Sequence, residues 1–207
     1  MALAPRDPRL LAGYAVTAVL VGVLGVSFAR ALAPALKREK ASPCAALDPS
    51  PWNEKLGRLP QAAPAITAKS WDGKDVGLEA YRGRVVFLNF WADWCPPCLD
   101  EMPAMDVLQK QLGGAPFTML AVGSGTTWES VRTTMARLVP GGSSMTFLMD
   151  PNGEAGSVGP LANAYGTKQL PETYLIDKHG VVRYYFANKR DWGSIRARQC
   201  LDSLLEE

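Results

Sequence analysis

Residues 85–98 read VVFLNFWADWCPPC, a mainly apolar run that ends in two cysteines separated by two prolines. The run is set off by Arg82-Gly83-Arg84 and is too short for a lone helix, which predicts a buried strand. Beyond Cys98, apolar residues recur every three or four positions until Gly113-Gly114, and this spacing predicts a helix. The stretch therefore predicts a strand that delivers a Cys-x-x-Cys pair to the N-terminus of a helix.

The segments on either side of this stretch predict alternating strands and helices. Strand patterns recur around turn signals such as Asp72-Gly73-Lys74 and Lys178-His179-Gly180, and helical patterns lie between them. We expect Asp191 to cap the last helix. The order of elements predicts an α/β domain with parallel and antiparallel strands in one sheet. The expected strands are 66–69, 76–78, 85–91, 117–122, 146–149, 172–177 and 181–186, and the expected helices are 99–112, 128–138, 158–165 and 191–205.

Four stretches of the sequence together resemble one known family. The octapeptide WADWCPPC at 91–98 resembles the active site of membrane-anchored TlpA/ResA-like thioredoxins, and residues 72–86 resemble that family's lead-in. The segment LPETYLID at 170–177 resembles the family's cis-proline segment and is similar to the cytochrome c maturation branch (CcmG/DsbE), whereas DWGS at 191–194 resembles the TlpA branch. The resemblance covers roughly 65–205. It implies a thioredoxin-like fold, a central mixed sheet flanked by helices, and thiol–disulfide exchange.

The two cysteines of this motif have the chemistry that such exchange requires. Cys95 opens the helix, where the helix dipole favours an anion, and Cys98 follows one turn later. We therefore expect Cys95 to be the nucleophile and Cys98 the resolving thiol, with their disulfide as the redox group and no other cofactor. Pro96 and Pro97 lack N–H groups that would stabilise a Cys95 thiolate. Its pKa is then expected near thioredoxin's value of about 7, with a potential nearer about −270 mV than about −120 mV, which favours a reductant.

A substrate groove is expected beside the dithiol. By the resemblance, Pro171 is a cis-proline that faces the cysteines, and Leu170 presents its backbone to an extended substrate. The alternative is an ordinary trans proline that opens an edge strand. Trp94 directly precedes Cys95 and is expected to cover the dithiol, with Pro96 and Pro97 completing the groove.

The proton acceptor for Cys98 is left open by the sequence. Asn89 stands at the strand position where thioredoxin itself has a buried aspartate, and an amide cannot take a proton. Glu101, Glu129 or water could do this work. Asn89 itself is either part of the proton route or a satisfied buried amide.

Cys44 and Cys200 form the remaining cysteine pair. We expect a structural disulfide between them, which the chain-entropy model credits with roughly 4–5 kcal/mol, and the alternative is two free thiols. A disulfide of this kind persists in oxidising compartments. Lipid modification of Cys44 is disfavoured by its sequence context. A zinc site needs four ligands, and besides the dithiol the chain offers Cys44, Cys200 and the single His179, so no metal site is expected.

The N-terminal region predicts a membrane anchor. Leu10–Ala29 is a stretch of 20 residues without a charge, enough to span about 30 Å of hydrocarbon. A cleaved signal at Ala29-Arg30-Ala31 is the alternative. We expect an anchor over 1–36, a Pro/Ala-rich linker over 37–64 and the thioredoxin-like domain over 65–207.

The function expected from these features is reduction of disulfides in extracytoplasmic proteins. The resemblance implies cytochrome c or oxidase copper-site assembly proteins as substrates and a membrane electron donor of the CcdA/DsbD type. The location expected is the bacterial inner membrane, with a single pass and the domain in the periplasm, although basic residues after the span argue for the opposite orientation. A net charge of +2 gives no basis for a nucleic-acid partner. A disulfide oxidant and a non-catalytic thioredoxin-like binding module are the alternatives.

Overall fold

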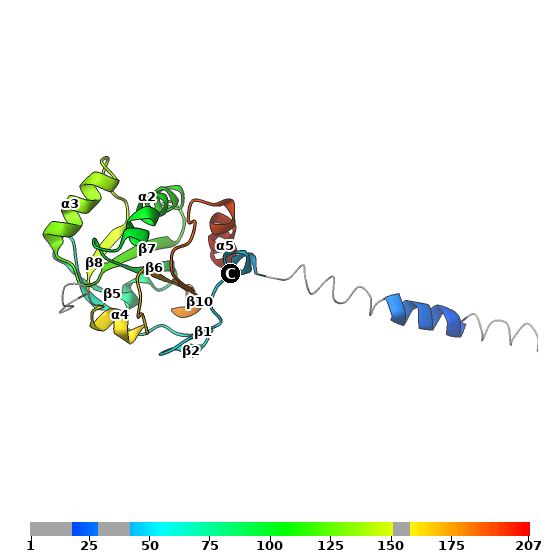
Figure 1. Ribbon diagram of the computed structural model, residues 1–207. Coiled ribbons are helices and arrows are strands. Elements are labelled where there is room, and N and C mark those ends of the chain that lie inside the picture. The colour runs from blue at the N-terminus through cyan, green and yellow to red at the C-terminus, as the bar shows by residue number, and fades with distance from the viewer. Residues whose placement is uncertain (1–17, 29–41, 151–157) are drawn as a thin grey trace, which may run out of the picture. The chain divides into compact units, whose positions relative to one another are not determined.

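The computed structural model describes residues 18–28, 42–150 and 158–207 (Figure 1). The chain divides into two compact units, residues 1–41 and residues 42–207. In the first unit, residues 18–28 are helical. Within the described ranges, no helix combines the length and apolar character needed to cross a membrane. Of the anchor expected over 10–29, residues 10–17 and 29 lie outside the described part of the chain.

The second unit is built on one eight-stranded mixed sheet, which confirms the expected α/β class. Its strand order is β3-β10-β9-β6-β7-β8-β4-β5, and a separate two-stranded ribbon is made by β1 and β2. The central strand β6 pairs in parallel with β7 and antiparallel with β9. The strands are β1 (Trp52–Asn53), β2 (Gly57–Arg58), β3 (Gln61–Ala62), β4 (Thr67–Ser70), β5 (Asp75–Gly77), β6 (Val85–Trp91), β7 (Phe117–Gly123), β8 (Thr146–Met149), β9 (Glu172–Ile176) and β10 (Val181–Ala187).

Helices cover both faces of this sheet (Figure 1). They are η1 (Pro43–Leu47), η2 (Leu78–Tyr81), α2 (Pro96–Gln111), α3 (Trp128–Leu138), α4 (Pro160–Ala164) and α5 (Ile195–Glu206). Because successive side chains of a strand point to opposite faces of the sheet, β6 contributes side chains to two hydrophobic clusters. Phe87 and Trp91 belong to the cluster that contains buried residues of α2, α3 and α5, whereas Leu88 and Phe90 belong to the cluster beside α4. Asn89 shares the alternation of Phe87 and Trp91, which places it on the α2 face.

Residues 42–64 differ from the linker that the sequence suggested. They belong to the compact unit, because Cys44 and Leu47 are buried and β3 pairs with β10 at the edge of the main sheet. The proline-rich composition of this segment is therefore compatible with short extended pieces that lie on the domain. The remainder of the expected linker, residues 37–41, lies outside the described residues.

The helix starts follow local capping chemistry. Thr127 caps α3 through a bond from the Ser130 N–H, and α3 spans the predicted residues. The last helix begins later than expected, since Ser194 and not Asp191 is its cap: Ser194 Oγ accepts from the Ala197 N–H at 3.2 Å. Asp191 Oδ1 instead accepts from the Gly193 N–H, in the turn before the helix. The predicted cap at Asp191 is thus wrong by three residues.

Candidate active site

The two cysteines of the motif lie at the start of α2 and are joined by a disulfide. Cys95 is the N-cap of α2, and its sulfur accepts the Cys98 N–H at 3.3 Å. Pro96 and Pro97 occupy the first two helical positions, so they contribute no donor to that sulfur. Cys95 is 4% exposed and Cys98 is fully buried. Cys95 is therefore the sulfur that an incoming thiol or disulfide meets first.

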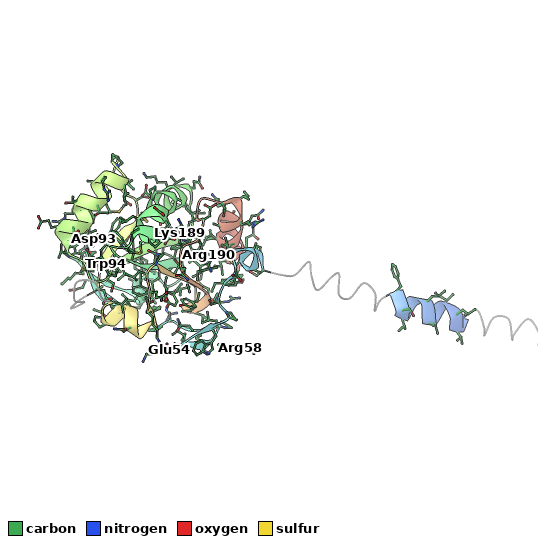
Figure 2. The ribbon with its side chains drawn as sticks, viewed as in Figure 1. Glu54, Arg58, Asp93, Trp94, Lys189 and Arg190 are labelled. Carbon is green, nitrogen blue, oxygen red and sulfur yellow. A yellow bond between two sulfur atoms is a disulfide. The ribbon has the colours of Figure 1, made fainter. Side chains whose placement is uncertain are left out.

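Exposed apolar side chains surround Cys95. Trp94, which is labelled in Figure 2, directly precedes Cys95 and is 44% exposed. Its indole N–H donates to the Gly125 carbonyl at 2.8 Å, which holds the ring against the loop that follows β7. Pro96 and Pro97 are also exposed. Apolar groups presented to water around a reactive group are suited to contact with another protein.

Leu170 and Pro171 reach the same region from the other side of β6. The Leu170–Pro171 peptide bond is cis. Phe90 pairs with Glu172 in the antiparallel register of β6 and β9, so the next position along places Pro171 beside Trp91, four residues before Cys95. Leu170 packs against the cluster that includes both cysteines. The strand register thus places Pro171 at the end of β6 that leads to Cys95.

A buried carboxyl group lies next to the dithiol on α2. Glu101 is three residues after Cys98, on the same face of the helix, and is 3% exposed. Glu101 Oε1 accepts from Asn89 Nδ2 at 3.1 Å, and Glu101 Oε2 accepts from the Arg190 N–H at 3.2 Å. Burial raises the pKa of Glu101 to about 7, against the opposing effect of these two donors and of Lys189. A carboxyl group with this pKa exchanges a proton readily near neutral pH.

Asn89 acts on this carboxyl group and not directly as a proton acceptor. Its amide also donates to Thr173 Oγ1 at 3.0 Å, so it bridges α2 and β9 beneath the dithiol. Asn89 Oδ1 has no hydrogen-bond partner among the described residues. Glu129, the other candidate acid, is exposed in the first turn of α3 and forms no side-chain hydrogen bond with Asn89. Of the two carboxylates considered from sequence, the structure brings Glu101 to the dithiol.

Two partners of this site were not anticipated. Thr173 lies two residues after Pro171 in the LPETYLID segment at 170–177, and that position was the available signal. The Arg190 N–H had no sequence signal, because a backbone donor is identified by its position in space and not by its residue type.

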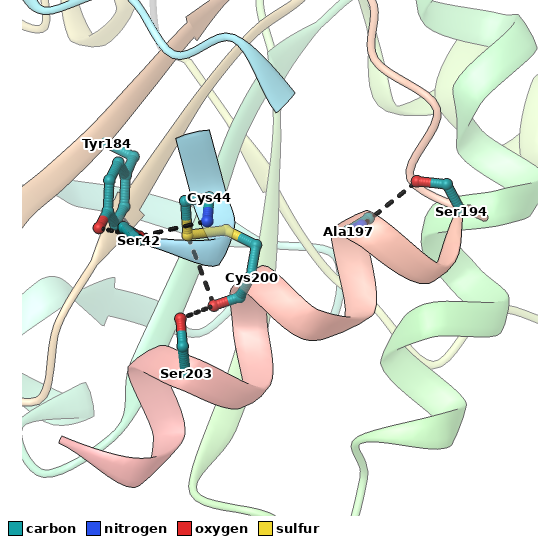
Figure 3. Close-up of a disulfide and its surroundings, with 7 residues drawn as sticks. All are labelled: Ser42, Cys44, Tyr184, Ser194, Ala197, Cys200 and Ser203. Carbon is teal, nitrogen blue, oxygen red and sulfur yellow. Dashed lines mark hydrogen bonds between the residues drawn. A yellow bond between two sulfur atoms is a disulfide. The ribbon is translucent and has the colours of Figure 1, made fainter. Parts of the chain in front are cut away.

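The second cysteine pair has different surroundings. Cys44 in η1 and Cys200 in α5 form a disulfide across 156 positions, and both are fully buried (Figure 3). Ser42, at the start of η1, accepts from the Tyr184 hydroxyl at 2.6 Å and from the Cys44 N–H at 3.2 Å. This disulfide fastens the N-terminal edge of the domain to its last helix.

Metal chemistry has no evident site in the part of the chain that the structure describes. No group of three or more His, Cys, Asp or Glu residues is arranged there to hold a metal ion. The single histidine, His179, stands in the turn between β9 and β10.

Comparisons with known proteins agree with this geometry. A family model described as the AhpC/TSA family matches residues 59–185. The thiol-disulfide oxidoreductase ResA of Geobacillus thermodenitrificans is 36% identical over 121 residues, which are 58% of this chain and 64% of that protein. The thioredoxin-like protein YneN of Bacillus subtilis is 33% identical over 123 residues, 59% of this chain and 68% of that protein. The chain thus spans less than two thirds of the ResA relative's length.

Solved structures show the same architecture. A putative thiol:disulfide interchange protein DsbE from Chlorobium tepidum matches with a TM-score of 0.61 and 26% identity, over 70% of this chain and 96% of that one. A putative thioredoxin from Neisseria meningitidis matches with a TM-score of 0.59 and 27% identity, over 70% and 90% of the two chains. The region matched in these structures carries a thioredoxin-like fold.

Proposed function

The chain belongs to the AhpC/TSA family and has a thioredoxin-like fold, and we propose that it reduces disulfides in other proteins through Cys95 and Cys98. The observation that carries this proposal is the arrangement of the two sulfurs. One is reachable at a helix N-terminus, and the other is buried within one turn of a carboxyl group whose pKa is about 7. The names of the relatives, thiol-disulfide oxidoreductase and thiol:disulfide interchange protein, support the same activity.

The proposed reaction begins with the reduced dithiol. The Cys95 thiolate attacks one sulfur of a substrate disulfide, a Cys95–substrate bond forms, and the first substrate sulfur leaves as a thiolate. The Cys98 thiol gives its proton to Glu101 and attacks the Cys95 sulfur. The mixed disulfide breaks, the second substrate thiolate leaves, and both substrate thiolates take protons. Two electrons pass to the substrate, and the product is the Cys95–Cys98 disulfide seen here.

The direction of electron flow is supported by the cap geometry. The Cys98 N–H is the one backbone donor to the Cys95 sulfur among the described residues, because Pro96 and Pro97 have none to offer. A thiolate with few donors is less stabilised, so the reduced form is a stronger reductant. We propose a membrane carrier of the CcdA/DsbD type as the electron source and assembly proteins of cytochrome c or of an oxidase copper site as substrates.

We propose the periplasmic side of the bacterial inner membrane as the location. The buried Cys44–Cys200 disulfide supports an oxidising compartment. The uncharged stretch over 10–29 supports a single-pass anchor ahead of the domain.

The test of the activity is reduction of insulin, with chemically reduced protein and its variants. Wild-type protein should reduce insulin and Cys95→Ser should not. The Cys44→Ala/Cys200→Ala double variant is the matched control, which should retain reduction because it leaves the dithiol in place. Full activity of Cys95→Ser would overturn the mechanism. A dithiol potential above about −150 mV would favour a disulfide oxidant instead.

The substrate is found by trapping. In Cys98→Ala the second step cannot occur, so mixed disulfides should accumulate at Cys95 in the native compartment. Mass spectrometry of the trapped species identifies the partner. Trapped species limited to glutathione or other small thiols would contradict a protein substrate.

A further inference from the structure

We propose that Arg190 is a positioning residue for Glu101, and that it fastens the loop carrying the Glu101 partner to η1. This inference rests on the proposed function, because it assigns a role in the proton route of the same dithiol. It concerns a residue between β10 and α5 that touches neither cysteine.

The Arg190 guanidinium binds main-chain carbonyls on two separate segments. Nε donates to the Leu47 carbonyl at 2.8 Å and Nη2 donates to the Asp48 carbonyl at 3.0 Å, both at the C-terminal end of η1. Nη1 donates to the carbonyls of residues 187, 188 and 189, at 2.8, 3.3 and 3.1 Å. The guanidinium group thereby joins η1 to the loop that follows β10. A planar group with five N–H donors suits such a role, and a lysine ammonium does not reproduce it.

The backbone of the same residue reaches the active site. The Arg190 N–H donates to Glu101 Oε2, while Asn89 of β6 donates to Oε1. The Glu101 carboxyl group is therefore held between the central strand and the 188–190 loop. Because the N–H cannot move independently of the loop, the bonds of the guanidinium group set where this donor stands.

The backbone conformation around Arg190 supports this reading. Asp48 and Asn188 are the non-glycine residues with positive φ in the described ranges, at 54° and 66°. Both offer their carbonyls to Arg190. Such conformations are uncommon for residues with a Cβ and persist where surrounding contacts hold them. The bonds of Arg190 are contacts of this kind on both segments.

The Cys44–Cys200 disulfide holds η1, the segment to which the Arg190 guanidinium group binds. Cys44 lies in η1 and is bonded to Cys200, and Ser42 is bonded to Tyr184 of β10 (Figure 3). A continuous path of bonds thus runs from the Cys44–Cys200 disulfide through η1 and Arg190 to Glu101. Loss of that disulfide should act on Glu101 in the same direction as loss of the Arg190 side chain, and more weakly.

The groups that face Glu101 set the sign of the expected effect. From its own helix come Cys98 and Asp100, and Asp100 is exposed and ion-paired to Lys189 at 3.0 Å. From the loop after β10 come Lys189, the Arg190 N–H and the Trp192 ring, whereas β6 and β9 offer the uncharged Asn89 and Thr173. The Arg190 N–H favours the ionised carboxyl group against the effect of burial. Displacing this donor therefore raises the pKa of Glu101 further.

The experiment is a carbon-13 NMR titration of glutamate side-chain carboxyl groups in the oxidised protein, in which no cysteine titrates. Glu101→Gln assigns the Glu101 signal. Arg190→Ala should raise its midpoint by roughly half to one pH unit, the equivalent of one ordinary hydrogen bond. Arg190→Lys should raise the midpoint of Glu101 almost as far. This variant keeps the positive charge but loses the hydrogen bonds of the guanidinium group to the main-chain carbonyls. Arg183→Ala, which removes a half-buried arginine of β10 paired with Asp177 and Glu207, should leave it unchanged.

Each outcome decides the proposal. An unchanged Glu101 midpoint in folded Arg190→Ala overturns the proposal. A raised midpoint in Arg190→Ala together with a wild-type midpoint in Arg190→Lys also overturns it, because the charge of residue 190 alone would then be responsible. If Arg190→Ala does not fold, Arg190→Lys decides. The Cys44→Ala/Cys200→Ala variant should show a smaller upward shift, and a downward shift would contradict the path through η1. None of these readouts needs a substrate, so failure here is distinct from failure of insulin reduction.

Discussion

The two disulfides of this domain have the same chemistry but differ in sequence separation and in what surrounds them. Cys95 and Cys98 are three positions apart, at a helix N-terminus with one sulfur reachable, and a buried acid lies one turn away. Cys44 and Cys200 are 156 positions apart and fully buried between η1 and α5. Access and nearby proton chemistry favour exchange at the first pair, while loop length favours stabilisation by the second. In the proposed mechanism, position in the fold and not the type of bond separates the redox disulfide from the structural one.

The largest effect expected is loss of activity at the first pair. Cys95→Ser should bring insulin reduction down to the uncatalysed background, because no other sulfur at the site is reachable. The rate of insulin precipitation measures this. If the Cys44→Ala/Cys200→Ala variant were the inactive one, the contrast between the two disulfides would be reversed.

The second prediction concerns stability. Removing the Cys44–Cys200 disulfide by double alanine substitution should lower the free energy of unfolding by roughly 4–5 kcal/mol, since it closes a long loop in the unfolded chain. The Cys95→Ala/Cys98→Ala variant is the matched control, and the same relation gives about 2 kcal/mol for its short loop. Denaturant unfolding of both oxidised variants provides the comparison. Equal losses would show that loop length does not distinguish the two bonds.

The third prediction concerns how Glu101, which lies near the Cys95–Cys98 disulfide, makes the stability of the domain depend on pH. The folded-state pKa of Glu101 is about 7 and the ordinary value is 4.5, so between these values the folded state binds more protons. Stability should therefore fall as pH rises through this window, by about 3 kcal/mol for this group. Glu101→Gln should remove that part of the decline in denaturant unfolding measured from pH 4 to 8.

Glu172→Gln is the control for this experiment. Glu172 is also buried, and burial raises its pKa, but its carboxyl group bonds Tyr174 among the residues of the other cluster. Its substitution should change the pH dependence of stability and leave the pH dependence of insulin reduction as in wild type. Glu101→Gln should change both. An effect of Glu172→Gln on reduction equal to that of Glu101→Gln would remove the special place of Glu101.

The smallest effect is expected from restoring a donor at the cap. Pro97→Ala adds an N–H at the second helical position, from which a backbone donor reaches the N-cap side chain. A bond to a charged group of about 1.5–3 kcal/mol should raise the potential of the dithiol by roughly 30–60 mV. Pro96→Ala is the control, because the first helical N–H is not a usual cap donor. Equilibration with glutathione measures both, and equal potentials would contradict the role assigned to the prolines.

Much of the fold could be predicted because its signals are local. The apolar run that forms β6 and the spacing of apolar residues from Leu99 to Leu108 within α2 depend on near neighbours in the chain, as does the pattern over 128–138 that forms α3. The last helix shows the limit of this reasoning. Asp and Ser are both favourable N-cap residues, so residue type alone does not choose between Asp191 and Ser194. In the structure α5 starts after Ser194, and Asp191 accepts a hydrogen bond in the preceding turn.

The sequence by itself determined a strand, a dithiol with two prolines and a helix, because the spacing of apolar residues and the positions of Cys and Pro are local features of the chain. Only the tertiary structure decided that Glu101 and not Glu129 stands by Cys98, since burial and a raised pKa depend on what packs around a carboxyl group. The same holds for η1 and Arg190, whose bonds join residues more than 140 positions apart. Contacts over such distances leave no periodicity in the sequence, because they arise only when the sheet brings its edges and helices together.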